Sequence, residues 1–374
     1  MATTKQIQND IGQLLIVGFD EAELSPSLIS LLQTIHPSGV ILFARNILSP
    51  QQTHKLLRDC GRQVAAPMFT CVDMEGGRVD RFRNVIGSSP SAADVFASGD
   101  HKLFAKHGKI IGTCCRTLGF NTDFAPVVDL AFEASRTVMS SRAVSADPKQ
   151  AVTYARQFLA GLASVGILGA GKHFPGLGGA NLDTHHALPE VTRSWKQLWQ
   201  EDLYPYRAMR KDFPMVLIGH ATYSDVTNDG KPASLSRKWI TEVLRKKIGY
   251  RGLIVSDDLE MGGVLAAAPI EQAAVEHIRA GGDLCLICRQ REFVERAHEA
   301  LTKAVEQDWR FARRVAESAS RIRAFKNKST ELKRRPPAPS PETIAKLSRQ
   351  VWEFGEQVRV AKLKTEAAPK AVLS

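Results

Sequence analysis

KHFPGLGGANLDTH, residues 172–185, follows an apolar run at residues 165–170 that is typical of a buried strand. Its first two residues, Lys172-His173, stand where this strand is expected to end. The proline and three glycines that come next predict a loop that need not be rigid. The loop carries Asp183 and His185, and a carboxylate so close to an imidazole can hydrogen-bond it, fix its tautomer and raise its basicity. Such a pair also occurs by accident on surfaces, but beside two titratable side chains at a strand end it indicates catalysis.

Short apolar runs of the strand type recur along the chain and alternate with amphipathic, helix-like segments. There are eight of them, at residues 14–19, 39–43, 68–73, 119–123, 166–173, 215–220, 253–257 and 283–287. Eight βα units in a chain of this length are typical of a (β/α)8 TIM barrel, so the predicted fold class is α/β with a single barrel domain. A doubly wound open sheet is the alternative, but no glycine-rich phosphate fingerprint follows an early strand.

The predicted barrel domain spans residues 1–325, and residues 326–374 are expected to form a basic, proline-rich connection, a docking helix and a frayed tail. The docking helix should begin at Ser340-Pro341, with serine as N-cap and proline in the first turn. A further helix is expected at residues 195–211. Apolar residues at helical spacing predict that one face of the docking helix packs on the barrel; they are Ile344, Leu347, Val351, Phe354 and Val358.

Polar or charged residues end several of the predicted strands. In a TIM barrel the chemistry takes place at the carboxyl ends of the strands. Strands that end at polar turns explain one or two such residues, but they explain a full set poorly, so this rim is the predicted active site. The residues are Asp73, Asp123, Lys172, His173, His220, Asp257 and Asp258.

VDMEGGRVDRF, residues 72–82, is the second informative stretch. Asp73 ends a strand, and an ionised carboxylate offers several acceptor sites for the hydroxyls of a sugar ring. Arg81 provides a donor fork for a hydroxyl or a carboxylate. Taken alone, the stretch is also compatible with a capped turn that carries surface arginines.

GLIVSDDLEMGG, residues 252–263, is the third informative stretch, because a continuous apolar run delivers a carboxylate to a strand end. Retaining glycosidases need such a carboxylate as the nucleophile that attacks the anomeric carbon. Asp257 and Asp258 are neighbours in a strand and should point in opposite directions, so only one of them can face the barrel axis. The alternative for this segment alone is a strand that ends in a helix-capping aspartate.

Together these stretches resemble the small cytoplasmic β-N-acetylglucosaminidases of glycoside hydrolase family 3, which act in bacterial peptidoglycan recycling. Residues 172–185 are similar to the family's KHFPGHG…DSH segment, and residues 72–82 to its VDxEGGRVxRF segment. The resemblance runs from about residue 13 to about residue 289 and implies a (β/α)8 barrel. Leu177 is a departure, because the family has a histidine at this position.

The resemblance also implies roles for individual residues. In the family pattern the nucleophile is the aspartate directly after a serine or threonine, which is Asp257 here and leaves Asp258 as a helix N-terminal or supporting group. His185, oriented by Asp183, takes the acid/base role that retaining glycosidases usually give to a carboxylate. The residues implied to hold the terminal sugar are Asp73, Arg81, Arg142, Lys172 and His173.

The implied activity is that of a retaining exo-β-N-acetylglucosaminidase. Its substrate would be a small carbohydrate, a muropeptide in which N-acetylglucosamine (GlcNAc) is joined to anhydro-N-acetylmuramic acid, and no metal or organic cofactor is suggested. Because a histidine acid/base tolerates an anionic acceptor, a phosphorylase is one alternative. A non-catalytic sugar-binding barrel is the other; it fits poorly with the presence of both Asp257 and His185, although Leu177 leaves it open.

The formal net charge of +11 raises the question of a nucleic-acid partner. Residues 326–374 hold 11 Lys and Arg against 5 Glu, which gives +6 and leaves +5 for the rest of the chain. The sequence has no basic patch interleaved with aromatic residues and no helix-turn-helix signature. We therefore expect no nucleic-acid binding, whereas an anionic substrate is compatible with the charge.

Neither a membrane span nor a secretory leader is expected. No apolar run approaches the roughly 20 residues of a membrane helix, and residues 1–9 lack the apolar core of a signal peptide. We therefore expect a cytoplasmic protein without membrane contact, and a monomer. A chain of this length needs no disulfide staples, and Cys285 and Cys288 are not expected to bind a metal although they form a CxxC pair.

Overall fold

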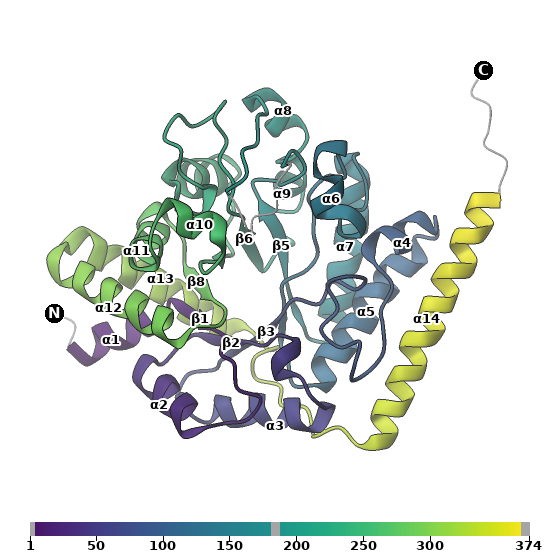
Figure 1. Ribbon diagram of the computed structural model, residues 1–374, viewed down its shortest axis with the longest axis horizontal. Helices are drawn as coiled ribbons and strands as arrows, with labels where there is room; N and C mark the ends of the chain where they lie inside the picture. The colour runs from purple at the N-terminus through teal and green to yellow at the C-terminus, as the bar shows by residue number, and fades with distance from the viewer. Residues whose placement is uncertain (1–3, 181–187, 368–374) are drawn as a thin grey trace.

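Eight parallel strands close into a barrel that helices surround (Figure 1). The structure, a computed structural model, describes residues 4–180 and 188–367. Each strand pairs with the next one along the chain and β8 pairs with β1, so the predicted TIM barrel is confirmed and the open-sheet alternative is wrong. The strands are β1 Leu15–Val17, β2 Gly39–Ile41, β3 Phe69–Val72, β4 Thr122–Asp123, β5 Leu168–Phe174, β6 Met215–Ile218, β7 Leu253–Asp258 and β8 Leu284–Ile287.

Helical segments lie between consecutive strands, as the alternating apolar pattern predicts. The α-helices are α1 Thr4–Gly12, α2 Pro26–Ile35, α3 Pro50–Gly61, α4 Ala92–Ala97, α5 Lys102–Thr117, α6 Arg136–Met139, α7 Pro148–Ser164, α8 Trp195–Gln200, α9 Tyr204–Ala208, α10 Gly262–Ala267, α11 Ile270–Ala280, α12 Arg291–Gln307, α13 Trp309–Lys328 and α14 Pro341–Ala367. A π-helix, η5 Lys238–Lys247, follows β6, and short 3-10 helices occur at η1 Ala44–Asn46, η2 Glu133–Ser135, η3 Ser140–Arg142 and η4 Ala233–Leu235.

Four of the helices begin at the same sequence signal. In each case the side chain of the first residue accepts a hydrogen bond from a backbone N–H of the first turn. The signals are Ser25-Pro26 for α2, Ser49-Pro50 for α3, Asp147-Pro148 for α7 and, as predicted, Ser340-Pro341 for α14. The proline that follows has no N–H to satisfy, so it fits the first turn without loss. These signals fix where the chain leaves a barrel loop and enters the outer ring of helices.

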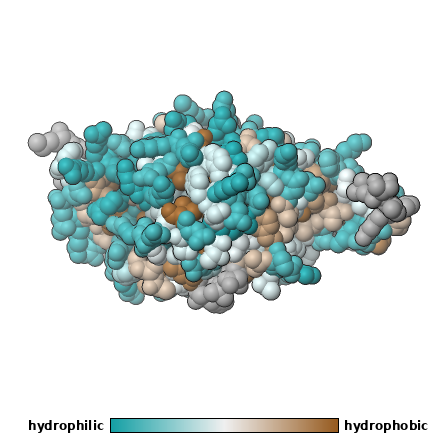
Figure 2. Space-filling view, turned by 90° about the horizontal axis from the view of Figure 1, so that it is seen from above, coloured by the Kyte–Doolittle hydropathy of each residue, from teal (hydrophilic) through white to brown (hydrophobic). Residues whose placement is uncertain are grey.

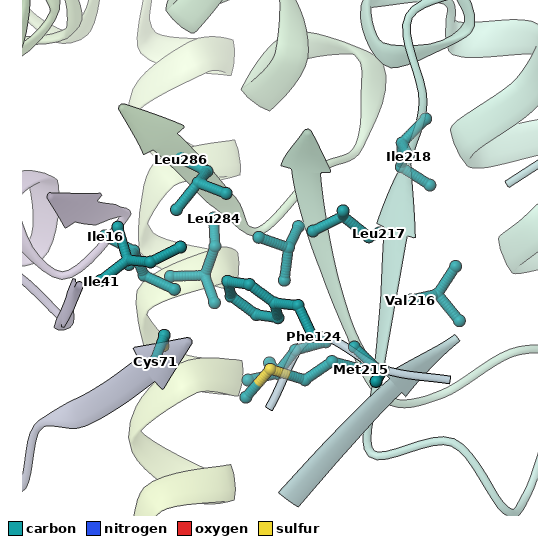
Figure 3. Packing of buried hydrophobic residues seen from close by; sticks show 14 of the residues in the cluster. Ile16, Ile41, Cys71, Phe124, Met215, Val216, Leu217, Ile218, Leu284 and Leu286 are labelled. Atoms are coloured by element: carbon teal, nitrogen blue, oxygen red, sulfur yellow. The ribbon is translucent and has the colours of Figure 1, made fainter. Parts of the chain in front are cut away.

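The barrel interior is filled with apolar side chains from the strands. Phe124, directly after β4, lies between the strands that carry Leu284 and Met215 (Figure 3). The strands are buried toward the helices as well as toward the axis, which explains why they read as continuous apolar runs rather than as alternating ones. Hydrophilic residues cover most of the face shown in Figure 2, and hydrophobic residues appear there only in patches between them.

Two strands lose their regular register at their carboxyl ends. The pairing of β5 with β6 shifts between Gly171 and Phe174, and the pairing of β7 with β8 shifts between Val255 and Asp258. Such irregularities increase the local twist and change the direction of side chains, and they are common beside active sites. Both shifts fall where the sequence places its candidate catalytic and sugar-binding residues.

The single helix that we expect at residues 195–211 is wrong in extent. The structure has two short helices there, α8 and α9, separated by residues 201–203. Pro205 stands in the first turn of α9, and it has no N–H with which to continue the hydrogen bonds of a preceding helix. A new helix therefore begins at this point instead of the old one continuing.

The last helix, α14, packs along α4 and α5 at the right of Figure 1. Its buried residues are Leu347, Val351, Phe354 and Val358, four of the five that the helical spacing places on one face, and Ile344 is half-buried. The division of the chain at residue 325 stays a prediction. None of the helices in the described part of the chain combines the length and the apolar character that crossing a bilayer requires.

Lys326 of α13 is buried at the amino-terminal end of the barrel and forms no salt bridge with a carboxylate of the described residues. Its Nζ donates hydrogen bonds to Gln13 Oε1 at 2.8 Å and to the Ser38 carbonyl at 2.9 Å, and it lies 5.1 Å from the centre of the Phe69 ring. Burial lowers the pKa of Lys326 from 10.5 to about 7. The folded chain therefore gives up a proton that the unfolded chain keeps over most of the alkaline range.

This burial predicts a specific pH dependence of stability. Between pH 7 and pH 10 the unfolded state binds the additional proton, so the free energy of unfolding should rise with pH, by at most about 1.4 kcal/mol per pH unit from this group. Lys326→Met should lack this rise, which urea denaturation at several pH values measures. The matched control is Lys328→Met, because Lys328 is exposed on the same helix. Parallel stability curves for the wild type and Lys326→Met would contradict the prediction.

Candidate active site

The proposed acid/base pair cannot be placed, because Asp183 and His185 lie outside the described residues. The other candidate residues come from the loops and strand ends at the carboxyl rim of the barrel. The segment that leads toward the pair is described as far as Ala180.

Two carboxylates and two cations alternate in a chain of ion pairs at this rim. Lys172 Nζ, at the end of β5, lies 2.7 Å from Asp73 Oδ1 and 2.7 Å from Glu75 Oε1. Arg142 also binds the Glu75 carboxylate through two hydrogen bonds. Its Nε lies 2.7 Å from Oε2 and its Nη2 lies 2.8 Å from Oε1. The Asp73 side chain is 19% exposed whereas that of Lys172 is 2% exposed, so Asp73 is the member that best presents an acceptor to a ligand.

Three of these groups, Glu75, Lys172 and Arg142, are held in their charged forms. Burial alone would raise the pKa of Glu75, but the charges and hydrogen bonds of Arg142 and Lys172 outweigh it and hold that pKa far below its usual range. Burial would likewise lower the pKa of Lys172, and the carboxylates of Asp73 and Glu75 raise it instead. The same balance raises the pKa of Arg142, chiefly through Glu75. Glu75, Lys172 and Arg142 therefore form a preorganised set of charges.

His173 is fixed by one partner on each ring nitrogen. Its Nδ1 lies 2.6 Å from Asp129 Oδ2, and its Nε2 lies 3.3 Å from Arg142 Nη2. A guanidinium can only donate, so Nε2 accepts and Nδ1 carries the proton that it donates to Asp129. The imidazole is thereby oriented by a carboxylate behind it and by an arginine from the ion-pair chain.

Asp129 also holds the start of the loop that follows β5. Besides His173 Nδ1, it accepts hydrogen bonds from the backbone N–H of His173 at 3.2 Å and from that of Leu177 at 2.7 Å. The Leu177 side chain is buried, and its methyl groups pack close to Gly219 after β6. Leu177, the departure from the family pattern, thus serves as a packing residue at this position.

Asp257 lies one residue before the end of β7 and is partly buried. Its Oδ1 accepts a hydrogen bond from the Asp258 backbone N–H at 2.9 Å. Burial would raise the pKa of Asp257, but His173, His220, the Asp258 N–H and Lys172 together keep it below the ordinary value. Asp257 is therefore ionised at neutral pH, which is the state that a nucleophile requires.

The neighbouring Asp258 differs in both contacts and charge. Its Oδ1 accepts hydrogen bonds from the backbone N–H groups of Glu260 at 3.0 Å and Cys288 at 3.2 Å. Burial, together with the nearby charges of Glu260 and Asp257, raises the pKa of Asp258 to about 7. A carboxyl group tied to the backbone in this way suits a structural role.

His220 lies under this strand end and is fully buried. Its Nε2 donates to the Asp258 carbonyl at 2.9 Å, and its Nδ1 accepts from Ser234 Oγ at 2.7 Å. Burial lowers the pKa of His220, and its hydrogen bond to the Asp258 carbonyl supports the backbone of β7. Ser234 lies in the segment between β6 and η5, so its hydrogen bond to His220 connects that segment to the site.

Arg81 is the predicted sugar-binding residue that the structure does not join to the ion-pair chain. Its guanidinium lies over the Phe43 ring, 5.3 Å from the ring centre. Its Nε has no hydrogen-bond partner within residues 4–180 and 188–367. Asp73, Arg142, Lys172 and His173 are brought together, whereas Arg81 stands apart beside the β2 loop.

Glu75 and Asp129 are the two site residues that the sequence reasoning missed. Glu75 lies within the stretch that carries Asp73, so its acidic character next to the predicted sugar-binding aspartate was an available signal. Asp129 follows an apolar run after β4, where a polar turn residue is unremarkable. Only its three contacts to His173 and Leu177 identify its function.

The variant Glu75→Gln tests the charge balance of this site. An amide would offer one acceptor oxygen where the carboxylate offers two, so Arg142 and Lys172 would lose part of their partner and repel each other. We expect kcat/KM on an aryl N-acetylglucosaminide to fall about 100-fold, which corresponds to roughly 2.7 kcal/mol. Glu190→Gln, at an exposed position, is the control. A Glu75→Gln enzyme within threefold of the wild type would contradict the assignment.

Known proteins share this fold and much of this sequence. A model of the glycosyl hydrolase family 3 N-terminal domain matches residues 6–324. A β-hexosaminidase of Idiomarina loihiensis is 32% identical over 298 residues, 79% of this chain and 89% of that protein, and one of Pseudomonas aeruginosa is 35% identical over 271 residues, 72% and 80% of the two chains. A solved glycoside hydrolase family 3 β-N-acetylglucosaminidase from a Paenibacillus species superposes with a TM-score of 0.88 at 29% identity, over 96% of this chain and 69% of that one. The chain therefore belongs to glycoside hydrolase family 3, and it is a glycoside hydrolase.

Proposed function

We propose that this glycoside hydrolase is a retaining exo-β-N-acetylglucosaminidase, which removes terminal β-linked GlcNAc from a small carbohydrate. The observation that carries the proposal is the ionised carboxylate of Asp257, a partly buried residue near the end of β7, close to Lys172-His173 at the end of β5. The β-hexosaminidases and the β-N-acetylglucosaminidase to which the chain is similar support the choice of sugar.

In the proposed mechanism Asp257 attacks the anomeric carbon and His185 gives a proton to the leaving oxygen. The glycosidic bond breaks, and a covalent glycosyl-enzyme forms on Asp257. His185 then takes a proton from water, whose oxygen attacks the same carbon and releases Asp257, so that the configuration is retained. Asp183 orients the imidazole. A histidine in this role adds no second negative charge beside the nucleophile.

The terminal sugar is proposed to be held by Asp73, Arg81, Arg142, Lys172 and His173. Asp73 supports this role best, because its carboxylate is the most exposed of the ion-pair chain and can accept from two hydroxyls. Lys172 and Arg142 keep that chain charged and rigid, so that little reorganisation is needed when a sugar binds. No metal or organic cofactor has a part in the proposed reaction.

We further propose muropeptides of peptidoglycan recycling as the natural substrates, and a monomeric enzyme in the cytoplasm. The support is the motif resemblance described above, together with the similarity to bacterial β-hexosaminidases. The decisive substrate comparison is GlcNAc-anhydro-N-acetylmuramic acid against a β-glucoside of the same size. Equal rates on the two would contradict the need for the 2-acetamido group.

Turnover of an aryl β-N-acetylglucosaminide in phosphate buffer tests the reaction class. A hydrolase should release free GlcNAc of β configuration, which proton NMR at early times detects. Accumulation of GlcNAc 1-phosphate would instead identify a phosphorylase. Absence of any turnover would leave a sugar-binding barrel as the better description.

A further inference from the structure

A second cavity lies at the opposite end of the barrel from the candidate active site. It has a volume of about 510 Å³ and is bounded by the residues that precede β3 and β4, by α3, and by the connection between α13 and α14. This volume is within the range that small-molecule sites occupy in proteins. In Figure 1 the yellow-green connection passes this end of the barrel, beside α3, before it reaches α14.

The charged residues that line the cavity are all cations. Two of its cations, Arg58 and Arg62, come from the end of α3 and the turn after it, and Lys333, Arg334 and Arg335 come from the connection; no aspartate or glutamate among the described residues lines it. A single carboxylate, Asp59, serves Arg58 and Arg62 together with Lys55. Three cations therefore share one negative charge beside the cavity.

Arg334 of the connection lies near the Glu331 carboxylate: burial would raise the pKa of Glu331, but hydrogen bonds from Ser329 and the backbone, together with the charge of Arg334, lower it. Neither Arg334 nor Arg335 forms a salt bridge with any residue in the described ranges, and Lys333 Nζ donates to the Asn327 carbonyl, at 2.8 Å. Glu331 is the acid nearest to Arg334 in the chain, and its carboxylate accepts a hydrogen bond from Ser329 Oγ at 2.7 Å. Burial and the charge of Arg334 lower the pKa of Arg116, and the charge of Glu331 acts in the opposite direction.

The inner wall of the cavity is apolar and contains one incompletely bonded histidine. Leu57, Met68 and Leu332 line it and are buried. His54 is only 6% exposed, and its Nε2 donates to the Pro336 carbonyl at 3.0 Å. Its Nδ1 is buried and has no partner among residues 4–180 and 188–367.

We propose that this cavity binds a nucleoside polyphosphate. The polyphosphate would lie between the arginines of α3 and those of the connection, since a guanidinium binds phosphate oxygens in pairs. The base would rest on Leu57, Met68 and Leu332, with His54 as a polar contact. Such a ligand bridges the barrel and the connection, so its binding fastens residues 329–340 to the barrel end. The site is independent of the sugar-binding rim and of the hydrolase reaction.

Calorimetric titration of the full chain with magnesium-free ATP tests the proposal, with pyrophosphate and adenosine as partial ligands. We expect ATP to bind at least tenfold more tightly than either one and to raise the melting temperature as its concentration rises. Arg334→Ala combined with Arg335→Ala should weaken ATP binding at least tenfold and leave the hydrolysis of an aryl glycoside unchanged. Added salt should weaken binding to the wild type.

The control removes the same charge elsewhere, as Lys102→Ala combined with Lys211→Ala, two exposed lysines that form no salt bridge with a described residue. It should bind ATP as the wild type does. Equal weakening in both double variants would show a net-charge effect and overturn the site. Absence of ATP binding at millimolar concentration, or pyrophosphate binding as tight as that of ATP, would overturn the proposed ligand.

Discussion

Asp257→Ala should abolish the turnover of every β-N-acetylglucosaminide, with a loss in kcat of at least about 10⁴-fold, or roughly 5.5 kcal/mol of barrier. A nucleophile is needed whatever the leaving group, so the loss should be similar for an activated aryl glycoside and for a disaccharide. The residue that fits this role is partly buried, and the pKa of its carboxylate is held below the ordinary value. Steady-state rates on both substrates, with circular dichroism to verify folding, provide the measurement.

Asp258→Asn is the matched control at the neighbouring position. Its carboxyl group receives backbone hydrogen bonds from Glu260 and Cys288, so the substitution should reduce stability more than catalysis. Mass spectrometry of the enzyme trapped with a 5-fluoro derivative of GlcNAc, which keeps the 2-acetamido group, should locate the adduct on Asp257. An adduct on Asp258, or on a residue outside 253–263, would overturn the proposed mechanism.

His185→Ala should reduce disaccharide cleavage by about 10²–10⁴-fold, the usual contribution of general acid–base catalysis. A nitrophenolate leaves without a proton, so formation of the glycosyl-enzyme from an activated aryl glycoside should slow much less. The second step still needs a base, and the covalent intermediate on Asp257 should therefore accumulate. Pre-steady-state kinetics on both substrates measure the two steps separately.

Two other residues of the segment that carries His185 provide controls for this prediction. His186→Ala changes the adjacent histidine and should leave both steps close to the wild-type rates. Asp183→Ala should resemble a weaker His185→Ala, because it removes the orienting partner and keeps the proton carrier. Equal losses on the disaccharide and on the aryl glycoside would contradict an acid/base role for His185.

The barrel was predictable from the sequence because parallel strands are buried on both sides. Each of the eight predicted runs, from residues 14–19 to 283–287, overlaps one observed strand, and polar groups stand at the ends where the rim forms. The break between α8 and α9 was not recognised, because the amphipathic pattern continues through Pro205. The periodicity of apolar residues indicates which side of a helix is buried, but it does not indicate where the backbone hydrogen bonds of the helix end.

The sequence predicts which residues gather at the candidate site, but not which hydrogen bonds and ion pairs join them. Four of the five proposed sugar-binding residues meet at the rim, whereas Arg81 stacks on Phe43 instead. The contacts of Glu75 and Asp129 reach residues that are 44 or more positions away in the chain, and no local pattern encodes them. The register shifts of β5 and β7 arise from pairing with neighbouring strands, so they too are absent from any single stretch.

Asp129 has a consequence for any attempt to change what the enzyme accepts. One carboxylate both sets the direction of the His173 imidazole and anchors the backbone at Leu177, from which the chain continues toward Asp183 and His185. In the proposed mechanism His173 recognises the sugar, whereas the loop that begins at Leu177 carries the residues that deliver the proton. Selectivity and turnover therefore both depend on the hydrogen bonds of Asp129. Redesign of the sugar pocket around His173 will shift the proton-transfer geometry unless the hydrogen bond that Asp129 accepts from the Leu177 N–H is kept.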